Sequence, residues 1–425
     1  MSFLKNNKYK LISIGFLFLF SLVFLRKAFF NNLITLPADI LVGVYYPWRD
    51  NIWNNLVAGV PIKNFELSDA VSQFYPWKLL TREILKTKQI PLWNHLTLSG
   101  APFLATYHSA VLYPLNLLYL VIGDTITAWN LQCFFQIFFS ALFTFLFLSN
   151  LKIGTYGSII GATSFSLSGY MMTWLTFGPG SQAGLWLPLI LLAIDKFKEN
   201  HSFRWTVIGT FALAMMLLAG DFQTPFYSLI LIFLYGLFRR NLRFVFLISL
   251  LGVMISSPQL LPTIELYLNS IRQGDNYISH LGYGIIPWRK LIQLFIPDFF
   301  GNPTTGNFWA GNFYFGEISY IGVVALVSLT FLLKRLKDKE VRFFGLFTFI
   351  SLTFIFPFPW AKLPYIFNLP LLASSSANRM LFLPIFTLSI LAGFGIDYLV
   401  KNGRNLKTEK LRSEERRVGK ECTIQ

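Results

Sequence analysis

The sequence predicts an all-α, polytopic integral membrane protein with about ten transmembrane helices and a long extracytoplasmic loop after the first of them. Hydrophobic residues make up 54% of the 425 residues and charged residues 13%, and the mean hydropathy is +0.54, far from the values of soluble domains. Aromatic residues make up 18%, which suits two interfacial belts where amphipathic rings lie at headgroup depth. The lipid bilayer is therefore the first expected partner.

Ten apolar windows are long enough to cross the roughly 30 Å of hydrocarbon, for which about 20 residues are needed and shorter windows are tolerated by local thinning. The windows fall near residues 11–34, 127–149, 156–177, 182–196, 205–220, 222–238, 244–262, 317–333, 343–357 and 379–399. If the N-terminus lies inside, the short inner segments hold 15 Lys and Arg residues, while the outer turns near Asp124, Gly178 and Asp221 hold none. The positive-inside rule therefore predicts a multi-pass protein of the cell membrane with a cytoplasmic N-terminus.

The net charge of +16 would indicate a nucleic-acid partner in a soluble protein. In a membrane protein these charges first report which side of the bilayer each segment faces, so no nucleic-acid partner is expected. The two cysteines, Cys133 and Cys422, are not expected to pair, because one lies in an apolar run and the other in the tail.

This orientation divides the chain into six parts. They are a cytoplasmic segment with the first transmembrane helix (1–35), the first extracytoplasmic loop with the candidate active site (36–126), transmembrane helices two to seven (127–262), the second extracytoplasmic loop (263–316), the last three transmembrane helices (317–400) and a cytoplasmic tail (401–425). The first window is expected to remain as an anchor, because Arg26 and Lys27 follow it and no small-residue cleavage site appears. The apolar segment from Tyr113 to Gly123 is too short to span, so it predicts an interfacial or re-entrant helix.

The last segment, RSEERRVGKECTIQ (412–425), changes abruptly to charged sequence without periodicity. One interpretation is a solvated basic tail. The segment also resembles a translated fragment of a sequencing vector, so we expect the native sequence to continue differently after about Leu411.

Carboxylates of the first loop are the candidates for acid–base chemistry. They are Asp39, Asp50, Glu66, Asp69 and Glu83. A carboxylate that faces a lipid-linked substrate can act as the general base, and a single base is enough for an inverting reaction. Asp69 is the first choice, because Gln73 and an aromatic segment follow it closely. The alternative is that Ser68 or Asp69 only caps the following helix.

A second polar segment of the loop, PLWNHLTLSGAPF (91–103), is rich in turn-forming residues. Trp93 could stack on a sugar, and Asn94 and His95 could bind its hydroxyl groups. The alternative is a loop of the interfacial aromatic belt, with His95 as an ordinary surface residue. His95 and His108 are not accompanied by a cysteine or carboxylate pattern, so a metal site is not indicated.

Seven segments occur along the chain in an order that is typical of one protein family. They read SDAVSQFYPW, PLWNHLTLSGAPF, YHSAVLYPLN, SLSGYMMTW, GDFQTPFY, SSPQLLPTIE and SANRM. This succession, which runs through nearly all of residues 36–400, resembles the YfhO-like bacterial membrane proteins, which are glycosyltransferases of the GT-C type. Two departures leave the activity of this chain open: family members are commonly longer, with more spans, and GDFQ stands where GHPQ is usual.

The resemblance implies a catalytic carboxylate in the first outer loop, which favours Asp69, with Asp39 as the second choice. Asp221 and Gln223 lie at an outer helix turn and are substrate-binding candidates, although a capped turn is the simpler alternative. The outer cations that could hold the donor phosphate are Arg272, Arg289, Lys290 and Arg379. Arg379 is preferred, because a guanidinium and the amides of a helix start could bind an anion together, whereas Arg289 could simply extend toward lipid headgroups.

The expected function is that of a hexosyltransferase that moves a sugar, with inversion, from a polyprenyl-phosphate donor to a cell-envelope glycan or lipid acceptor on the outer face. No cofactor is expected, because the loop contains no Asp-x-Asp pair and cations of the protein could stabilise the leaving phosphate; a divalent metal stays an open alternative. Two other functions remain: a flippase or transporter of lipid-linked sugars, and a catalytically inactive membrane scaffold. A transporter would be expected to carry ionisable groups at mid-membrane depth. We further expect the site to close where the Asp69 loop meets Asp221 and Arg379.

Overall fold

The structure is a computed structural model that describes residues 2–31, 33–53, 62–270, 284–310, 314, 316–367, 369, 372–373 and 375–421, with side chains described from 8 to 403. About 70% of the chain is helical, and there is almost no strand. The all-α prediction is therefore confirmed. Part of the second outer loop (271–283, 311–313 and 315), including the candidate Arg272, lies outside the described residues.

One main helix falls within or across each of the ten apolar windows. These helices are α1 (Ser2–Phe24), α6 (Thr125–Asn150), α7 (Thr155–Ser166), α10 (Leu187–Asn200), α11 (Phe203–Leu218), α12 (Gln223–Phe238), α13 (Leu242–Leu268), α15 (Val323–Leu329), α16 (Lys339–Ile355) and α18 (Phe382–Glu421). Shorter helical segments connect them: α8 (Gly169–Thr173), α9 (Pro179–Gly184), η7 (Trp288–Leu294), η8 (Pro303–Thr305), η9 (Thr330–Lys334), η10 (Pro359–Lys362), α17 (Leu363–Ile366) and η11 (Ala377–Leu381).

Fewer helices than expected are long and apolar enough to cross a membrane. In the part of the chain that the structure describes there are three, at Thr125–Asn150, Leu242–Leu268 and Ala377–Gly403, and a fourth if the pair Lys339–Ile355 and Pro359–Ile366, bent by 65°, is one span. The sequence prediction of about ten such helices is not met. The windows contain breaks that hydropathy alone does not reveal: α7, for example, ends at Ser166, and Ser168 caps the new helix α8, where its side chain accepts the N–H of Met171.

Helix length explains part of the difference. Both α11 and α12 have 16 residues, which gives each a length of about 24 Å at 1.5 Å per residue, below the roughly 30 Å of hydrocarbon in a typical bilayer. These helices are apolar but short. The three long helices indicate a membrane protein on their own.

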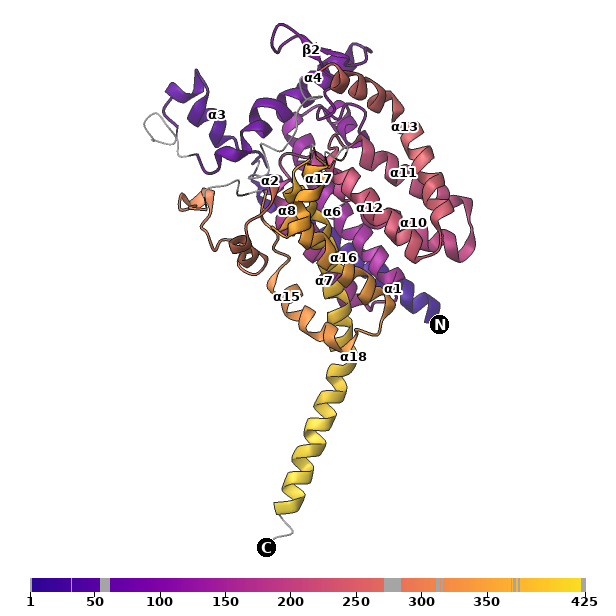
Figure 1. The fold of residues 1–425 in the computed structure, drawn as a ribbon. Helices are drawn as coiled ribbons and strands as arrows, with labels where there is room; N and C mark the ends of the chain where they lie inside the picture. The colour runs from indigo at the N-terminus through magenta and orange to yellow at the C-terminus, as the bar shows by residue number, and fades with distance from the viewer. Residues whose placement is uncertain are drawn as a thin grey trace.

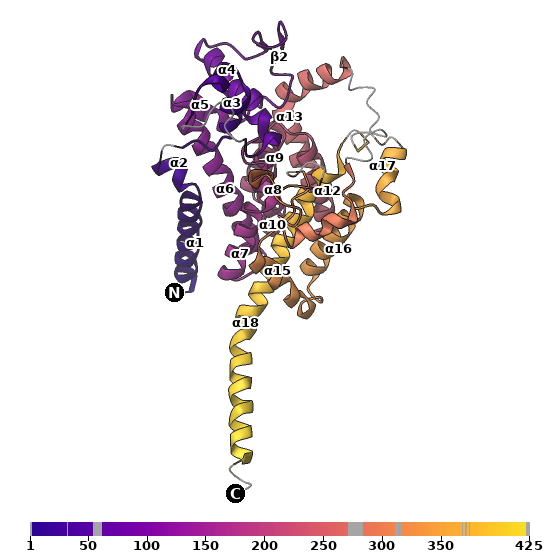
Figure 2. The same ribbon diagram turned by 90° about the vertical axis from the view of Figure 1, so that its left-hand side faces the viewer.

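The main helices form an upright bundle with a layer of short elements at one end (Figures 1 and 2). In both views the N-terminus and the projecting part of α18 lie at the opposite end of the bundle. Within the bundle α18 packs along α7 and α16, α6 packs against α7 and α10, and α11 lies against α10 and α13. We call the end with the short elements the outer end, after the orientation that the sequence predicts.

The outer layer is built almost entirely from the first loop. Its elements are α2 (Arg26–Phe30), α3 (Asp39–Val44), η1 (Trp48–Asp50), η2 (Phe65–Leu67), the π-helical η3 (Ala70–Phe74), α4 (Tyr75–Lys86), β1 (Trp93–Asn94), β2 (Ala101–Pro102), η4 (Pro114–Leu117) and α5 (Leu118–Val121). The strands β1 and β2 form a two-residue antiparallel pair. The short helix expected between Tyr113 and Gly123 is made by η4 followed by α5.

Two glycines allow α7 and α18 to approach closely. A Cβ atom at Gly157 would clash with the carbonyl oxygen of Gly393, and a Cβ at Gly393 would lie 3.0 Å from the oxygen of Gly157. Small residues at such crossings let helix backbones touch, which is a common way to hold helices together in lipid. This contact places the N-terminal part of α18 in the centre of the bundle.

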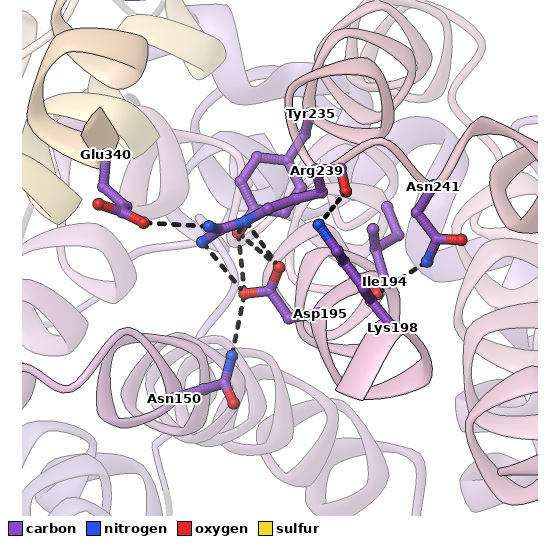
Figure 3. A network of polar contacts seen from close by, with 8 residues as sticks. All are labelled: Asn150, Ile194, Asp195, Lys198, Tyr235, Arg239, Asn241 and Glu340. Atoms are coloured by element: carbon purple, nitrogen blue, oxygen red, sulfur yellow. Dashed lines mark hydrogen bonds and ion pairs between the residues drawn. The ribbon is translucent and has the colours of Figure 1, made fainter. Parts of the chain in front are cut away.

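The end of the bundle opposite the outer layer is held by partly buried ion pairs (Figure 3). Arg239, at the end of α12, lies 2.9 Å from Asp195 of α10 and 3.0 Å from Glu340 of α16. Asp195 also accepts hydrogen bonds from Tyr235 at 2.9 Å and from Asn150 of α6 at 2.9 Å. Four helices are therefore joined by one network of charged and polar groups.

Candidate functional site

The first outer loop contacts the turn between α11 and α12 at Gly220. This glycine has φ +88°, and a Cβ atom there would lie 2.9 Å from the carbonyl oxygen of Tyr107 and 3.0 Å from Cβ of Ala110. A side chain at this position would be strained and would push the loop away. The Tyr107 ring also stacks on Phe222 with the centroids 3.9 Å apart. The loop and the turn that carries Asp221 therefore form one surface.

Asp221 is buried beside three tyrosines. The residue is 8% exposed, and its Oδ2 accepts the N–H of Thr224, in the first turn of α12, at 2.9 Å. This bond agrees with the alternative interpretation of Asp221 as part of a capped turn. Its carboxylate interacts electrostatically with Tyr107, Tyr170 and Tyr227. Burial first, and then this charge, raises the pKa of Tyr107 well above its usual range. The Tyr107 hydroxyl therefore stays protonated and donates a hydrogen bond to the carbonyl of Leu217.

Arg379 interacts electrostatically with two of the same tyrosines, Tyr170 and Tyr227. It belongs to η11, just before α18, and its guanidinium carbon lies 3.8 Å from the ring centroid of Trp174. In the described part of the chain Arg379 makes no ion pair closer than 4.0 Å. Its amide is already bonded to the carbonyl of Ser376 at 3.1 Å, so the guanidinium, rather than a helix-start amide, is the group available to an anion.

Two hydroxyl contacts lie near the charged residues in the sequence. The Tyr170 hydroxyl lies 2.8 Å from Oγ1 of Thr224, three residues after Asp221, and the Tyr227 hydroxyl lies 3.0 Å from Oγ of Ser375, four residues before Arg379. The structure thus brings Asp221 and Arg379 into one cluster, which we call the outer cluster: Tyr107, Tyr170, Trp174, Asp221, Thr224, Tyr227, Ser375 and Arg379.

A row of aromatic rings connects the helix after Asp69 to the outer cluster. Phe74 packs on Phe177 with the centroids 6.0 Å apart, and Phe177 packs on Trp174 at 5.1 Å, directly beneath Arg379. Phe74 also meets the ring of His108 at 6.4 Å. The segment that carries Asp69 is therefore docked against the cluster through its aromatic residues.

Asp69 itself is exposed. Its Oδ1 accepts a hydrogen bond from the side chain of Gln73 at 3.2 Å, and its side chain does not cap η3. The capping interpretation of Asp69 is therefore not supported. Asp39, the second choice for the catalytic carboxylate, is half-buried and accepts the backbone N–H of Lys63 at 2.7 Å. This bond is a structural contact within the loop.

The remaining sugar-binding candidates lie on the hairpin of β1 and β2, at the tip of the outer layer (Figure 1). Asn94 is buried, and both ends of its amide are engaged locally, with the N–H of Leu96 at 2.9 Å and Oγ1 of Thr97 at 2.9 Å. Trp93 and His95 are exposed. None of the hydrogen bonds, ion pairs or ring contacts recorded among the described residues joins this hairpin to Asp221 or Arg379.

The other predicted binding residues differ in what they can offer. Gln223 is half-buried, and its Oε1 has no hydrogen-bond partner among the described atoms. Arg289 is exposed, and among the described residues its side chain donates only to the carbonyl of Ala310, at 3.5 Å. Lys290 is buried and paired with Glu317, between the rings of Phe300 and Phe308. Its amine is therefore not available for a phosphate.

Lys78 was not anticipated by the sequence reasoning. It is 6% exposed, its Nζ donates to the carbonyl of Ser109 at 3.2 Å, and burial lowers its pKa from 10.5 to about 7. The missed signal was spacing: Lys78 follows Phe74 by four residues and so shares the buried face of the helix. The three tyrosines were missed because aromatic residues in apolar windows look alike, whether they face lipid or the protein interior.

The described residues contain no group of three or more His, Cys, Asp or Glu side chains that could hold a metal ion. What the outer cluster offers is a buried carboxylate, an unpaired guanidinium on an indole ring and several hydroxyl donors. Such a set can bind a phosphate and the hydroxyls of a sugar. No family model matches the chain, and no curated protein matches it either.

Proposed function

We propose that this protein is a YfhO-like membrane glycosyltransferase of the GT-C type, which transfers a sugar with inversion from a polyprenyl-phosphate donor to a cell-envelope acceptor on the outer face. The observation that carries the proposal is the outer cluster, where Asp221 and Arg379 share buried tyrosines. The first loop packs on this cluster through Tyr107 and Phe74.

In this proposal Arg379 binds the donor phosphate. The guanidinium lies at the outer start of the last apolar helix, where a lipid-linked phosphate reaches the protein from the bilayer, and Trp174 holds it from one face. A fixed cation stabilises the negative charge that develops on the leaving phosphate. Asp221 is held by the N–H of Thr224 and would orient the sugar through its second oxygen.

Asp69 is the proposed general base. Its Oδ2 accepts no hydrogen bond from the described residues, and the side chain is exposed to the aqueous side, from which an acceptor hydroxyl would arrive. Asp221 is the competing base, but it is buried and already bonded to a backbone amide. An exposed carboxylate next to the cluster suits proton abstraction better than a buried one.

The topology belongs to the proposal as well. A helix falls in each of the ten apolar windows, and the two described chain ends lie on the same side of the bundle, as an even number of crossings requires. We propose that the shorter helices cross a locally thinned bilayer, with the N-terminus in the cytoplasm.

The decisive experiment is sugar transfer in proteoliposomes that contain a synthetic polyprenyl-phosphate hexose. Asp69→Asn should lower the transfer rate by about a hundredfold or more, as expected for loss of a general base. Asp50→Asn is the matched control, because Asp50 is another exposed carboxylate of the same loop and should leave the rate unchanged. Undiminished transfer by Asp69→Asn would remove Asp69 as the base.

The same assay separates the alternative functions. A flippase would carry the intact donor across the bilayer without releasing polyprenyl phosphate, and a scaffold would do neither. Reversible loss of transfer on adding a chelator would show that a divalent metal takes part.

A further inference from the structure

A cavity of about 330 Å³ lies where α1 and α2 meet the chain segment 33–35. Arg26 and Lys27 line one side, and Leu33, Ile34 and Thr35 line the other. This cavity takes no part in the outer cluster described above. A cavity of this volume has room for a small polar headgroup.

The wall of the cavity is fixed by α6. The side chain of Asn130 donates to the carbonyl of Leu33 at 2.8 Å and accepts the N–H of Thr35 at 2.9 Å, and Trp129 donates to the carbonyl of Thr35 at 3.0 Å. These bonds join segments more than ninety residues apart in the sequence. The cavity is therefore held open by the bundle and does not depend on a mobile loop.

The two cations in the wall lack acidic partners. Arg26 reaches only the carbonyl of Val23, at 3.5 Å, and Lys27 forms no side-chain hydrogen bond or ion pair within the described part of the chain. Both side chains are exposed. Two adjacent unpaired cations at a preformed cavity are suited to a phosphate group.

Apolar side chains surround these cations on the outside. Phe24 is 47% exposed, Phe30 73% and Leu33 52%. Figure 2 places α2 at the outer end of α1, below α3 and α4 of the outer layer. This is the depth at which an apolar helix ends and headgroups begin. A ligand with both a phosphate and apolar chains matches the two kinds of surface.

We infer that this cavity binds the phosphate headgroup of an anionic glycerophospholipid. The hydroxyl of Thr35 in its wall already donates to Asn130 at 3.0 Å and to Cys133 at 3.3 Å, so the two cations are the side-chain donors left for a ligand among the described lining residues. The inference goes beyond the proposed transferase activity and does not depend on it. The bound lipid would anchor the start of the first outer loop to the bilayer surface.

The test is lipid binding measured by native mass spectrometry on the purified, delipidated full chain, with phosphatidylglycerol and phosphatidylcholine as probes. The wild-type protein should retain phosphatidylglycerol at least tenfold more strongly than phosphatidylcholine. The double variant Arg26→Gln/Lys27→Gln should bind phosphatidylglycerol about thirty-fold more weakly, because two cations near an anionic headgroup are lost. The charge-preserving double variant Arg26→Lys/Lys27→Arg should bind it as the wild type does.

The control is Lys63→Gln/Lys88→Gln, which removes the same charge from two exposed lysines elsewhere in the first loop and should leave binding unchanged. Equal retention of the two phospholipids, or undiminished binding by Arg26→Gln/Lys27→Gln, would overturn the inference. So would retention of polyprenyl phosphate but not phosphatidylglycerol, because the cavity would then be a carrier site.

Discussion

Lys78 places an amine in the interior of the outer layer with a single carbonyl, that of Ser109, as its partner among the described residues. Burial disfavours the charged form, which is why the pKa falls to about 7. The residue therefore opposes folding whenever it must be buried with its charge. A lysine in such a position can be retained only where the surrounding contacts of α4 with residues 103–111 supply more stability than the charge removes.

The pH dependence of stability follows from this shift. Between about pH 7 and pH 10.5 the unfolded chain keeps the proton on Lys78 while the folded chain has released it, so the free energy of unfolding rises with pH across this window. The full shift corresponds to about 5 kcal/mol. Below pH 7 both states are protonated and the contribution is constant at its least favourable value.

We predict that Lys78→Met removes this part of the pH dependence. The variant should be more stable than the wild type by several kcal/mol near pH 6.5, and the difference should shrink as the pH approaches 10, because methionine does not titrate. Thermal unfolding in detergent at a series of pH values measures it. Lys86→Met, at an exposed position of the same helix, is the control. If the stability difference between Lys78→Met and the wild type did not change with pH, Lys78 would not be a buried group that titrates in this range.

Residue types alone were enough to predict Asp221 and Arg379 as candidate site residues, because few charged groups lie at the ends of apolar windows. They were not enough to decide between the carboxylates of the first loop. Asp39 turned out to bind the backbone of Lys63, and Asn94 to bind its own turn; both roles depend on contacts that composition does not encode. Side chains that can bind a substrate and side chains that bind their own loop look the same in a sequence.

At the scale of the elements, helix positions could be predicted and helix breaks could not. Apolar windows located all ten main helices because burial in lipid or protein requires long apolar runs. The break at Ser168 depends on one hydroxyl that accepts a backbone N–H, and the sharp turn at Gly178 on its φ of +92°. Single residues such as these do not alter mean hydropathy. The sequence therefore predicted more unbroken membrane-spanning helices than the described residues contain.

The crossing of α7 and α18 provides an element-scale prediction. Gly157→Ala should destabilise the protein by about 1–3 kcal/mol, because the new Cβ meets the backbone of Gly393 and forces the helices apart. Gly345→Ala in α16, where a Cβ would have nothing within 4 Å, should be neutral or slightly stabilising through helix propensity. Thermal unfolding of both variants checks this, and equal effects would show that the crossing is not tightly packed.

At the scale of the whole molecule, the orientation in the membrane remains a prediction. Cysteine labelling in intact cells tests it with a membrane-impermeant maleimide. Lys88→Cys, at the end of α4, should react from outside, whereas Lys337→Cys, between η9 and α16, should react only after the membrane is opened. Both positions are exposed.

We expect the native cysteines to contribute little to the labelling. Cys133 is buried, and Cys422, which lies outside the described residues, can be replaced by serine. Reaction of both introduced cysteines from the same side would contradict the proposed topology, because Lys88 and Lys337 lie in segments assigned to opposite faces.

The ion network around Arg239 also has a consequence for biogenesis. Asp195 is made 44 residues before Arg239, and Glu340 follows Arg239 by 101 residues. At about 5–20 residues per second, the ribosome needs about 2–9 s to supply Arg239 after Asp195. During this interval the only one of these partners already synthesised is Asn150, 45 residues earlier. The first half of the bundle therefore carries an unneutralised acid while it is being inserted, and the arrival of α12 is the moment at which that half becomes able to close.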